Sequence, residues 1–289
     1  DNMIDTTNPF ALFSCETTVN VSQTIDFDAS DSFDLDGSIS LYSWDFGDGI
    51  TKTGVKTSHK FTADGEYDVT LTVTDNDGLT DTVSKAITVN WRDIWVNKSW
   101  KNTDYGYEVA LGKYYGINAF DDVQTAIDDA LDMESIYVLN HRYEYVGSHA
   151  IIVNKAIDIR GENRDNVTIY GTGNHDLLVI TADGANVSNM TFIWNSQTTS
   201  AITIEGDNNI FYRNNVTTAK NGIEITAGSI GNLLLENKIT GCEYGVTLDS
   251  SNVNTIQHND IINCSFNGIQ LIDCVDTTIA DNLIKNSGD

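Results

Sequence analysis

The stretch that decides the fold is a short aliphatic segment that recurs through the second half of the chain. Its last four copies are Ala201-Ile-Thr-Ile204, Gly222-Ile-Glu-Ile225, Gly245-Val-Thr-Leu248 and Gly268-Ile-Gln-Leu271, and they start 21, 23 and 23 residues apart. Two earlier copies are Ala150-Ile-Ile-Val153 and Leu177-Leu-Val-Ile180. Short runs of branched aliphatic residues are typical of buried strands. A period near 23 residues without a helix in each unit predicts a parallel β-solenoid.

A second repeated motif, an asparagine followed by an aliphatic residue, recurs with the same period as the aliphatic segment. In four successive repeats an asparagine stands two residues before an aliphatic residue, at Val216, Ile239, Ile261 and Ile284. Stacked coils bring like residues above one another, and stacked amides can bond to each other and to the backbone. We therefore expect one turn of the solenoid to hold an asparagine ladder, formed by Asn214, Asn237, Asn259 and Asn282.

An amphipathic segment precedes these repeats. Residues 119–132 are predicted to form one helix, with acidic residues at its N-terminal end. Its apolar face consists of Phe120, Val123, Ile127 and Leu131. Such a helix can cover the first coil of a solenoid, whose terminal repeats need caps.

From about residue 117 onward the chain resembles the NosD-type right-handed parallel β-helix of the pectin-lyase-like superfamily. The Asn-x-Ile and Gly-Ile-x-Ile/Leu motifs carry the resemblance, together with the helix and the segments 135–139 and 156–161 that follow it. Many members of that superfamily cleave or epimerise acidic polysaccharides. The chain stops inside a repeat at Asp289. We therefore expect the full protein to continue, or another subunit to cover the end.

The first part of the chain has a different pattern. Residues 24–29, 67–73 and 86–89 alternate between apolar and polar residues, which is typical of half-buried strands. Turn dipeptides separate such segments, at Asp36-Gly37, Asp48-Gly49, Asp64-Gly65 and Asp77-Gly78. About seven strands in about 80 residues predict an antiparallel β-sandwich over residues 8–90. The fold class expected for the whole chain is therefore all-β, with one helix.

This sandwich resembles the PKD (polycystic kidney disease) domain. The matching segments are Asn8–Ser14, Asp34–Ile39, Val69–Asp75 and Trp44-Asp-Phe-Gly-Asp-Gly49. The resemblance implies an immunoglobulin-like extracellular spacer or adhesion module that is not catalytic. A PKD domain followed by β-helix coils is similar to modular cell-surface proteins of archaea, including surface-layer proteins.

These features divide the chain into four parts. Residues 1–7 are a linker, 8–90 the sandwich, 91–118 an aromatic-rich junction and 119–289 the β-helix with its cap helix. The junction could pack the two domains together, seal the end of the β-helix, or stack on sugar rings. Its aromatic residues are Trp91, Trp95, Trp100, Tyr105, Tyr107, Tyr114 and Tyr115.

Three aspartates of the sandwich are candidate metal ligands. Asp34, Asp36 and Asp75 lie in oxygen-rich loops of the kind that binds calcium. The alternative is that such residues only cap backbone groups of turns. We expect Trp44 in the core and a structural role for His59, and no cofactor other than calcium.

The net charge and the glycosylation sequons favour an extracellular protein. The chain has 42 acidic and 16 basic residues, a formal charge of −26, which disfavours binding to nucleic acid and anionic membranes. No apolar run reaches the roughly 18 residues of a membrane span. Four cysteines are too few for a disulfide framework. Cys242 and Cys264 fall on one column of adjacent coils, and we expect buried thiols there, with a disulfide between them as the alternative. Seven glycosylation sequons start at Asn20, Asn97, Asn166, Asn186, Asn189, Asn215 and Asn263.

One column of the repeats could in principle support catalysis. Arg213, Glu236, His258 and Asp281 occupy matching positions in successive coils. A polysaccharide lyase needs a positive group beside a uronate and a base, but mixed charges are also typical of a solvated solenoid face. We therefore expect an extracellular structural or adhesive protein, not an enzyme, that associates with itself or with other surface proteins. The alternatives are a polysaccharide lyase or epimerase and a carbohydrate-binding module.

Overall fold

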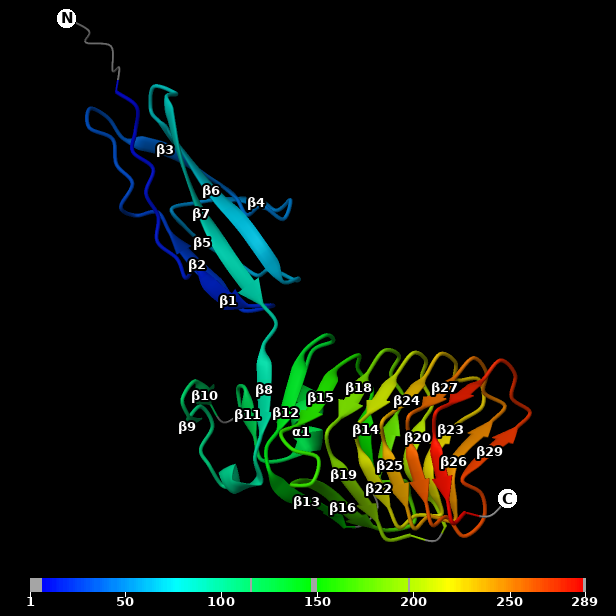
Figure 1. Ribbon diagram of the computed structural model, residues 1–289. Helices are drawn as coiled ribbons and strands as arrows, with labels where there is room; N and C mark the ends of the chain where they lie inside the picture. Colours follow the sequence, from blue (N-terminus) through cyan, green and yellow to red (C-terminus); the bar gives the residue numbers. More distant parts are fainter. Residues whose placement is uncertain (1–6, 115, 147–149, 197, 288–289) are drawn as a thin grey trace, which may run out of the picture. The chain divides into compact units, whose positions relative to one another are not determined.

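The computed structural model describes residues 7–114, 116–146, 150–196 and 198–287. The expected linker therefore lies almost entirely outside the described residues. The chain divides into two compact units, Asp1–Arg92 and Asp93–Asp289. Each unit is described by itself below, with the element labels of Figure 1.

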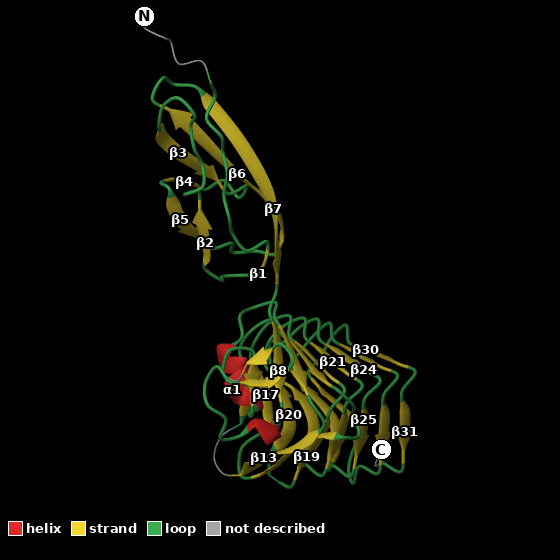
Figure 2. Cartoon of the chain, turned by 90° about the vertical axis from the view of Figure 1, so that its left-hand side faces the viewer, coloured by secondary structure: helices red, strands yellow, loops and turns green. Residues whose placement is uncertain are grey.

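The first unit is a β-sandwich (Figures 1 and 2). A five-stranded sheet in the order β1-β7-β6-β3-β4 faces a two-stranded sheet of β2 and β5. The strands are β1 (Thr18–Asn20), β2 (Ile25–Asp28), β3 (Ile39–Asp45), β4 (Thr51–Thr53), β5 (Lys56–His59), β6 (Gly65–Asp75) and β7 (Thr80–Asn90).

The sandwich core follows directly from the alternation of its strands. Along β6 the inward residues Val69, Leu71 and Val73 are fully buried. They pack with Trp44, whose indole Nε1 donates a 2.8 Å hydrogen bond to the Gly54 carbonyl. The central tryptophan therefore has both its apolar body and its polar atom satisfied, as buried tryptophans usually do.

The second unit is a parallel β-solenoid with three sheets along its length (Figure 1). The nine-stranded sheet contains β8 (Asp93–Val96), β11 (Ala119–Phe120), β12 (Ser135–Val138), β15 (Asp158–Gly161), β18 (Asn186–Ser188), β21 (Ile210–Tyr212), β24 (Leu233–Leu235), β27 (Thr255–Gln257) and β30 (Thr278–Ala280). The seven-stranded sheet contains β13 (His141–Val146), β16 (Val167–Thr172), β19 (Thr191–Trp194), β22 (Asn215–Thr217), β25 (Lys238–Thr240), β28 (Asp260–Ile262) and β31 (Leu283–Lys285). The six-stranded sheet contains β14 (Ile151–Val153), β17 (Leu178–Ile180), β20 (Ser200–Ile204), β23 (Asn221–Ile225), β26 (Tyr244–Asp249) and β29 (Ile269–Ile272).

Aliphatic columns fill the solenoid. Leu178, Ile202, Ile223 and Val246 are paired in register on four successive coils and are almost fully buried. In-register parallel stacking puts each side chain above its equivalent about 4.8 Å away, so like residues pack continuously. The all-β prediction, a sandwich followed by a parallel solenoid with one α-helix at its N-terminal end, is confirmed.

The cap helix is shorter than expected. α1 covers Val123–Asp129 rather than residues 119–132, because Asp122 is its N-cap and accepts a hydrogen bond from the Thr125 amide. Phe120 pairs with Val96 in the nine-stranded sheet instead. Beyond the helix Leu131 is 43% exposed, and Lys155 Nζ donates to carbonyl groups at the helix C-terminal end.

The region expected as a junction is largely part of the solenoid. β8 pairs with both β11 and β12 and so forms part of the first coil. The 3₁₀ helix η1 (Lys98–Trp100) and a hairpin of β9 (Glu108–Ala110) and β10 (Lys113–Tyr114) follow it. Within the described residues, no helix is both long and apolar enough to span a membrane.

Candidate functional site

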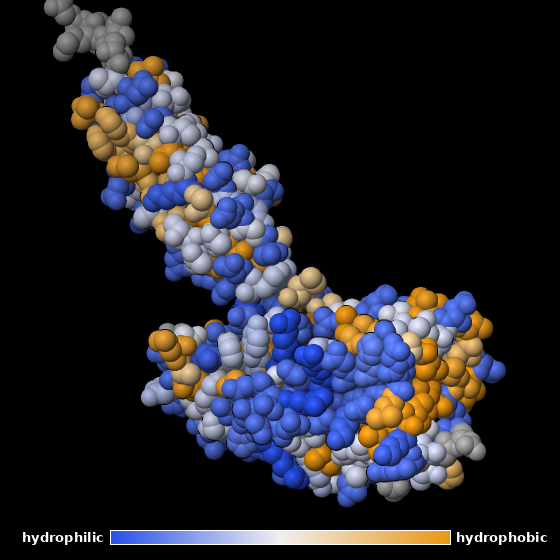
Figure 3. Space-filling view, in the orientation of Figure 1, coloured by the Kyte–Doolittle hydropathy of each residue, from blue (hydrophilic) through white to orange (hydrophobic). Residues whose placement is uncertain are grey.

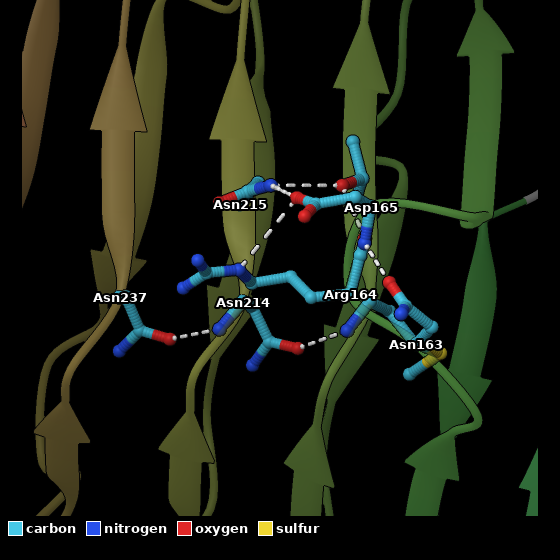
Figure 4. Close-up of polar contacts among 8 residues, drawn as sticks. Asn163, Arg164, Asp165, Asn214, Asn215 and Asn237 are labelled. Atoms are coloured by element: carbon cyan, nitrogen blue, oxygen red, sulfur yellow. Dashed lines mark hydrogen bonds and ion pairs between the residues drawn. The ribbon is translucent and has the colours of Figure 1, made fainter.

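The structure places the four ladder asparagines above one another in the turn between the nine-stranded and seven-stranded sheets. Asn214 accepts from the Met190 amide, and the backbone amide of Asn214 donates to Oδ1 of Asn237 (2.9 Å; Figure 4). The same bond joins Asn237 to Asn259 and Asn259 to Asn282, at 2.9 and 2.8 Å. Each side-chain Nδ2 also donates to a carbonyl of the preceding coil, as Asn237 does to Phe211 (2.7 Å). The ladder therefore bonds coil to coil through side-chain amides, which are buried at Asn214, Asn237 and Asn259.

A second asparagine column lies in the turn between the six-stranded and nine-stranded sheets. The Asn209 amide donates to Oδ1 of Asn232, and the Asn232 amide donates to Oδ1 of Asn254, both at 2.9 Å. All three side chains are fully buried. The sequence analysis missed this column, although its spacing of 23 and 22 residues carries the same signal as the first ladder.

The residues of the mixed-charge column all lie in turns and share the left-handed backbone conformation. Arg213, Glu236, His258 and Asp281 all have positive φ, between 53° and 55°, directly before the ladder asparagines. Arg213 Nε donates to Glu236 Oε2 at 2.7 Å, which raises the pKa of the guanidinium. His258 and Asp281 are 3.9 Å apart and half exposed or more. These residues pair with one another along the solvated edge, so they do not converge as an acid and a base on a common cavity.

A polar face that the sequence analysis missed covers part of the six-stranded sheet. Asp176 accepts hydrogen bonds from the Ser200 amide (2.9 Å) and from Thr203 Oγ1 (2.6 Å). On the next coil, Glu224 accepts hydrogen bonds from Ser200 Oγ and from Asn221 Nδ2, the latter at 2.9 Å. Two carboxylates thus flank a pair of hydroxyl groups on three adjacent coils.

Next to Glu224 lies a polar atom without a partner. Thr247 pairs with Glu224 in register and is only 6% exposed, and its Oγ1 has no hydrogen-bond partner within the described residues. Buried hydroxyl groups usually have a partner. Asp176, Ser200 and Glu224 therefore form a hydrogen-bonded polar network across three coils, and its hydroxyl groups are buried.

In the sandwich, the three candidate metal ligands do not act as one cluster. No group of three acidic, histidine or cysteine side chains within the described residues could hold a metal ion. Asp36 accepts from Thr7 instead. Both carboxylate oxygens of Asp34 and Oδ2 of Asp75 are buried without a partner in the described chain. The loop that precedes β3 is joined to the turn between β6 and β7, because the Ser38 amide donates a hydrogen bond to Oδ1 of Asn76 (2.7 Å).

Asp75 also caps backbone groups of a turn, which was the alternative to metal binding for these aspartates. Its Oδ1 accepts from the amides of Asp77 (2.8 Å) and Leu79 (2.9 Å) and so shapes the turn between β6 and β7. His59 is 7% exposed, stacks on Phe46 and bonds to Asp48 at 2.7 Å. Both contacts are structural.

The aromatic residues of segment 91–118 belong to different surroundings. Trp91 packs against the sandwich core, and Trp100 is buried in the solenoid unit. Trp95 stacks on Tyr137, and Lys113 Nζ lies 3.9 Å from the centre of its ring. The ring of Trp95 is therefore in contact with both Tyr137 and Lys113. Tyr115 lies outside the described residues.

The sequon asparagines differ in accessibility. Asn20, Asn166 and Asn263 are exposed, whereas Asn97, Asn186, Asn189 and Asn215 are half-buried. Asn215 Nδ2 donates to Asp165 (3.2 Å) and Thr191 (3.1 Å), so the atom that a glycan would modify is engaged (Figure 4).

All four cysteines are free thiols. Burial raises the pKa of Cys242 to about 12 and raises that of Cys264, so both remain protonated near neutral pH.

Comparison with known families agrees with this architecture. Residues 6–90 match the PKD domain family, and residues 150–289 match the right-handed β-helix region family. The chain is a PKD domain followed by a right-handed β-helix. The PKD domain is 47% identical over 81 residues to part of collagenase ColA of Clostridium perfringens, which covers 28% of this chain and 7% of the collagenase.

Two further similarities are also confined to the PKD domain. It is 48% identical over 59 residues to part of the pre-pro-metalloprotease PrtV of Vibrio cholerae, 20% of this chain and 6% of that protein. The solved PKD1 domain of the same metalloprotease is 37% identical and covers 29% of this chain and 99% of that domain, with a TM-score of 0.27. The chain thus spans a tenth or less of the length of the curated relatives named here.

Proposed function

We propose that this chain is an extracellular structural or adhesive part of a cell-surface protein, such as a surface-layer, sheath or matrix component, that associates with copies of itself or with neighbouring proteins. The observation that carries the proposal is the use of buried polar side chains in the β-helix. The two asparagine columns bond each coil to the next. A rod held together in this way suits a load-bearing spacer.

Other features support the extracellular location. PKD domains similar to this one belong to collagenases and a metalloprotease. Sequon asparagines at positions 20, 166 and 263 are exposed. The charge of −26 keeps the surface hydrated and opposes non-specific aggregation.

The proposal is tested by measuring association and turnover on the same sample. We expect the 289-residue chain to associate with itself as its concentration rises, and to release no unsaturated sugars from uronate polymers. Salt should promote the association, since it screens repulsion between acidic copies. A chain that stays monomeric and cleaves such polymers would contradict the proposal.

A second candidate function, binding or processing of a polysaccharide, is favoured by the polar face of the six-stranded sheet. Asp176 accepts a hydrogen bond from the Ser200 amide and Glu224 accepts one from Ser200 Oγ, so two carboxylates, the groups that process glycans in many enzymes, lie on the coils on either side of Ser200. The test is binding and cleavage of neutral and acidic glycans by the parent chain and by Asp176→Asn and Glu224→Gln variants. Equal behaviour of all three proteins would exclude this role.

We also propose that Asp34 and Asp75 contribute to a calcium site in the PKD domain. Three buried carboxylate oxygens without partners in the described chain support it, because burying a carboxylate without a hydrogen bond or cation is costly. Calcium prefers oxygen ligands of this type, completed by carbonyl groups and water.

A further inference from the structure

The outer face of the nine-stranded sheet has a hollow that is one coil wide. Its floor is strand β18, whose outward residues are Asn186 and Ser188, since Val187 between them is fully buried. The strands on either side, β15 and β21, form the walls of the hollow. Its volume is about 370 Å³, within the range of roughly 300–1,000 Å³ that is typical of small-molecule sites.

Strand register fixes which side chains line the hollow. The outward columns are Asp158, Asn186 and Ile210 on one side, and Arg160, Ser188 and Tyr212 on the other. Ser188 is therefore a short side chain between two long ones. Neighbouring strands lie about 4.8 Å apart, so Arg160 and Tyr212 are on strands about 10 Å apart, with room for a flat group between them.

The wall formed by β15 offers hydrogen-bonding groups in a fixed arrangement. Arg160 Nε donates to Asp158 Oδ2 at 2.7 Å, and Nη2 of Arg160 donates to the same oxygen. A guanidinium has five N–H donors, so three donors of Arg160 and Oδ1 of Asp158 remain for a ligand. Within the described residues, the side chains of Asn186, Ser188 and Asn189 also have no hydrogen-bond partner, and all three line the hollow.

The wall formed by β21 is apolar. Ile210 is 37% exposed, and Tyr212 lines the hollow beside it. Arg213 lies 4.8 Å from the centre of the Tyr212 ring, but its bond to Glu236 holds it toward the following coil, away from the hollow. Figure 3 shows a similar change over the face of this unit in view, from hydrophilic on the first coils to more apolar on the last coils. The hollow thus lies between a polar and an apolar wall.

We propose that this hollow binds one sugar unit of a neutral glycan chain. A pyranose ring has apolar faces, which pack on aromatic rings, and hydroxyl groups around its edge, which bond to planar polar side chains. Charge favours a neutral sugar, because Asp158 and Arg160 balance each other and the chain as a whole carries −26, which repels polyanions. The inference rests on the adhesive role in the proposed function and names the class of ligand that is held.

The backbone of the sheet disfavours a peptide strand at this place. β18 pairs with β15 and β21, and these two strands are paired on their far sides with β12 and β24. The main-chain pairing by which extended peptides add to a sheet is therefore already complete in these coils. Recognition must use side chains, which suits a sugar.

The experiment measures binding of neutral hexasaccharides of glucose, mannose and N-acetylglucosamine by titration calorimetry, with hexagalacturonate as the charged comparison. We expect a neutral hexasaccharide to bind the parent chain. Ser188→Tyr fills the hollow with a ring and should bind it at least about tenfold more weakly. The matched control is Gln257→Tyr, which places the same ring in the same column three coils further on and should bind as the parent does.

Two variants of Tyr212 test the apolar wall. Tyr212→Ala should bind the sugar about three- to tenfold more weakly, because it removes a ring contact. Tyr212→Phe keeps the ring and should stay within about twofold of the parent. Circular dichroism checks that all variants fold. Because Asn186 and Asn189 begin sequons, the protein is made in a host without N-glycosylation, so that no attached glycan fills the hollow.

The outcomes separate this inference from the proposed function. If Ser188→Tyr binds the sugar as the parent does, the hollow is the wrong site. Tighter binding of hexagalacturonate than of the neutral sugars overturns the neutral class, and binding of a gelatin peptide that Ser188→Tyr removes would replace the sugar with a protein partner. If no sugar binds while the chain associates with itself, this inference fails and the structural role stands. A monomeric chain that binds a neutral sugar in the hollow contradicts the self-association alone.

Discussion

The two units of this chain stabilise their strands in different ways. In the PKD domain, antiparallel strands join through tight turns capped by aspartate, and the core is built around Trp44 and its aromatic neighbours. In the β-helix, strands that pair are about a coil apart in sequence, the core is a set of aliphatic columns, and buried asparagines bond one coil to the next. Stability in the first unit therefore depends on one aromatic cluster. In the second it depends on nearest-neighbour contacts that repeat along the rod.

The largest effect is expected from the aromatic cluster. Trp44→Ala removes a fully buried side chain and its bond to Gly54, and it should destabilise the PKD domain by about 4 kcal/mol. Calorimetry that resolves two transitions should show the first unit melting early and the β-helix transition unchanged. Movement of both transitions would show that the units do not fold independently.

A slightly smaller effect is expected from the ladder. Asn237→Ala leaves the Asn214 amide and the Phe211 carbonyl buried without these partners, and it should lower the free energy of unfolding of the β-helix by about 3 kcal/mol. The control is Asn286→Ala, because Asn286 Nδ2 donates a hydrogen bond to Asn263 Oδ1 of the preceding coil in an exposed position. A ladder variant as stable as this control would show that the buried amides contribute nothing.

Calcium removal should affect only the PKD domain. At a concentration 100 times the dissociation constant, a bound ion stabilises the folded state by about 2.7 kcal/mol. Chelation should therefore lower the first melting transition, and Asp75→Asn should remove the response to calcium. A transition that chelation does not move, with no calcium bound in titration calorimetry, would leave Asp75 as a turn former alone.

The smallest effect is expected on the solvated edge of the β-helix. Arg213→Ala breaks the ion pair with Glu236, but both side chains are exposed, and such pairs contribute little. The melting transition of the β-helix should stay within experimental error of the parent. A clear loss of stability would mean that this column contributes to the coil-to-coil bonding in the way the asparagines do.

Much of the fold could be predicted because each unit has a local signature. Alternating strands and Asp-Gly turns predicted the sandwich, and the period near 23 residues predicted the solenoid and the positions of Asn214 to Asn282. The helix was predicted too long, since apolar periodicity does not show that Asp122 caps it or that Phe120 joins a strand.

The sequence by itself determined which residues are equivalent from coil to coil, because a constant period places like side chains in one column. Only the tertiary structure decided which different residues meet. Asp176, Ser200 and Glu224 are each 24 residues from the next, while strands β17, β20 and β23 start 22 and 21 residues apart. The hydrogen bonds between these side chains therefore depend on the lengths of the turns. Hydrogen bonds between coils require register within an ångström, and register is set by the packed coils together.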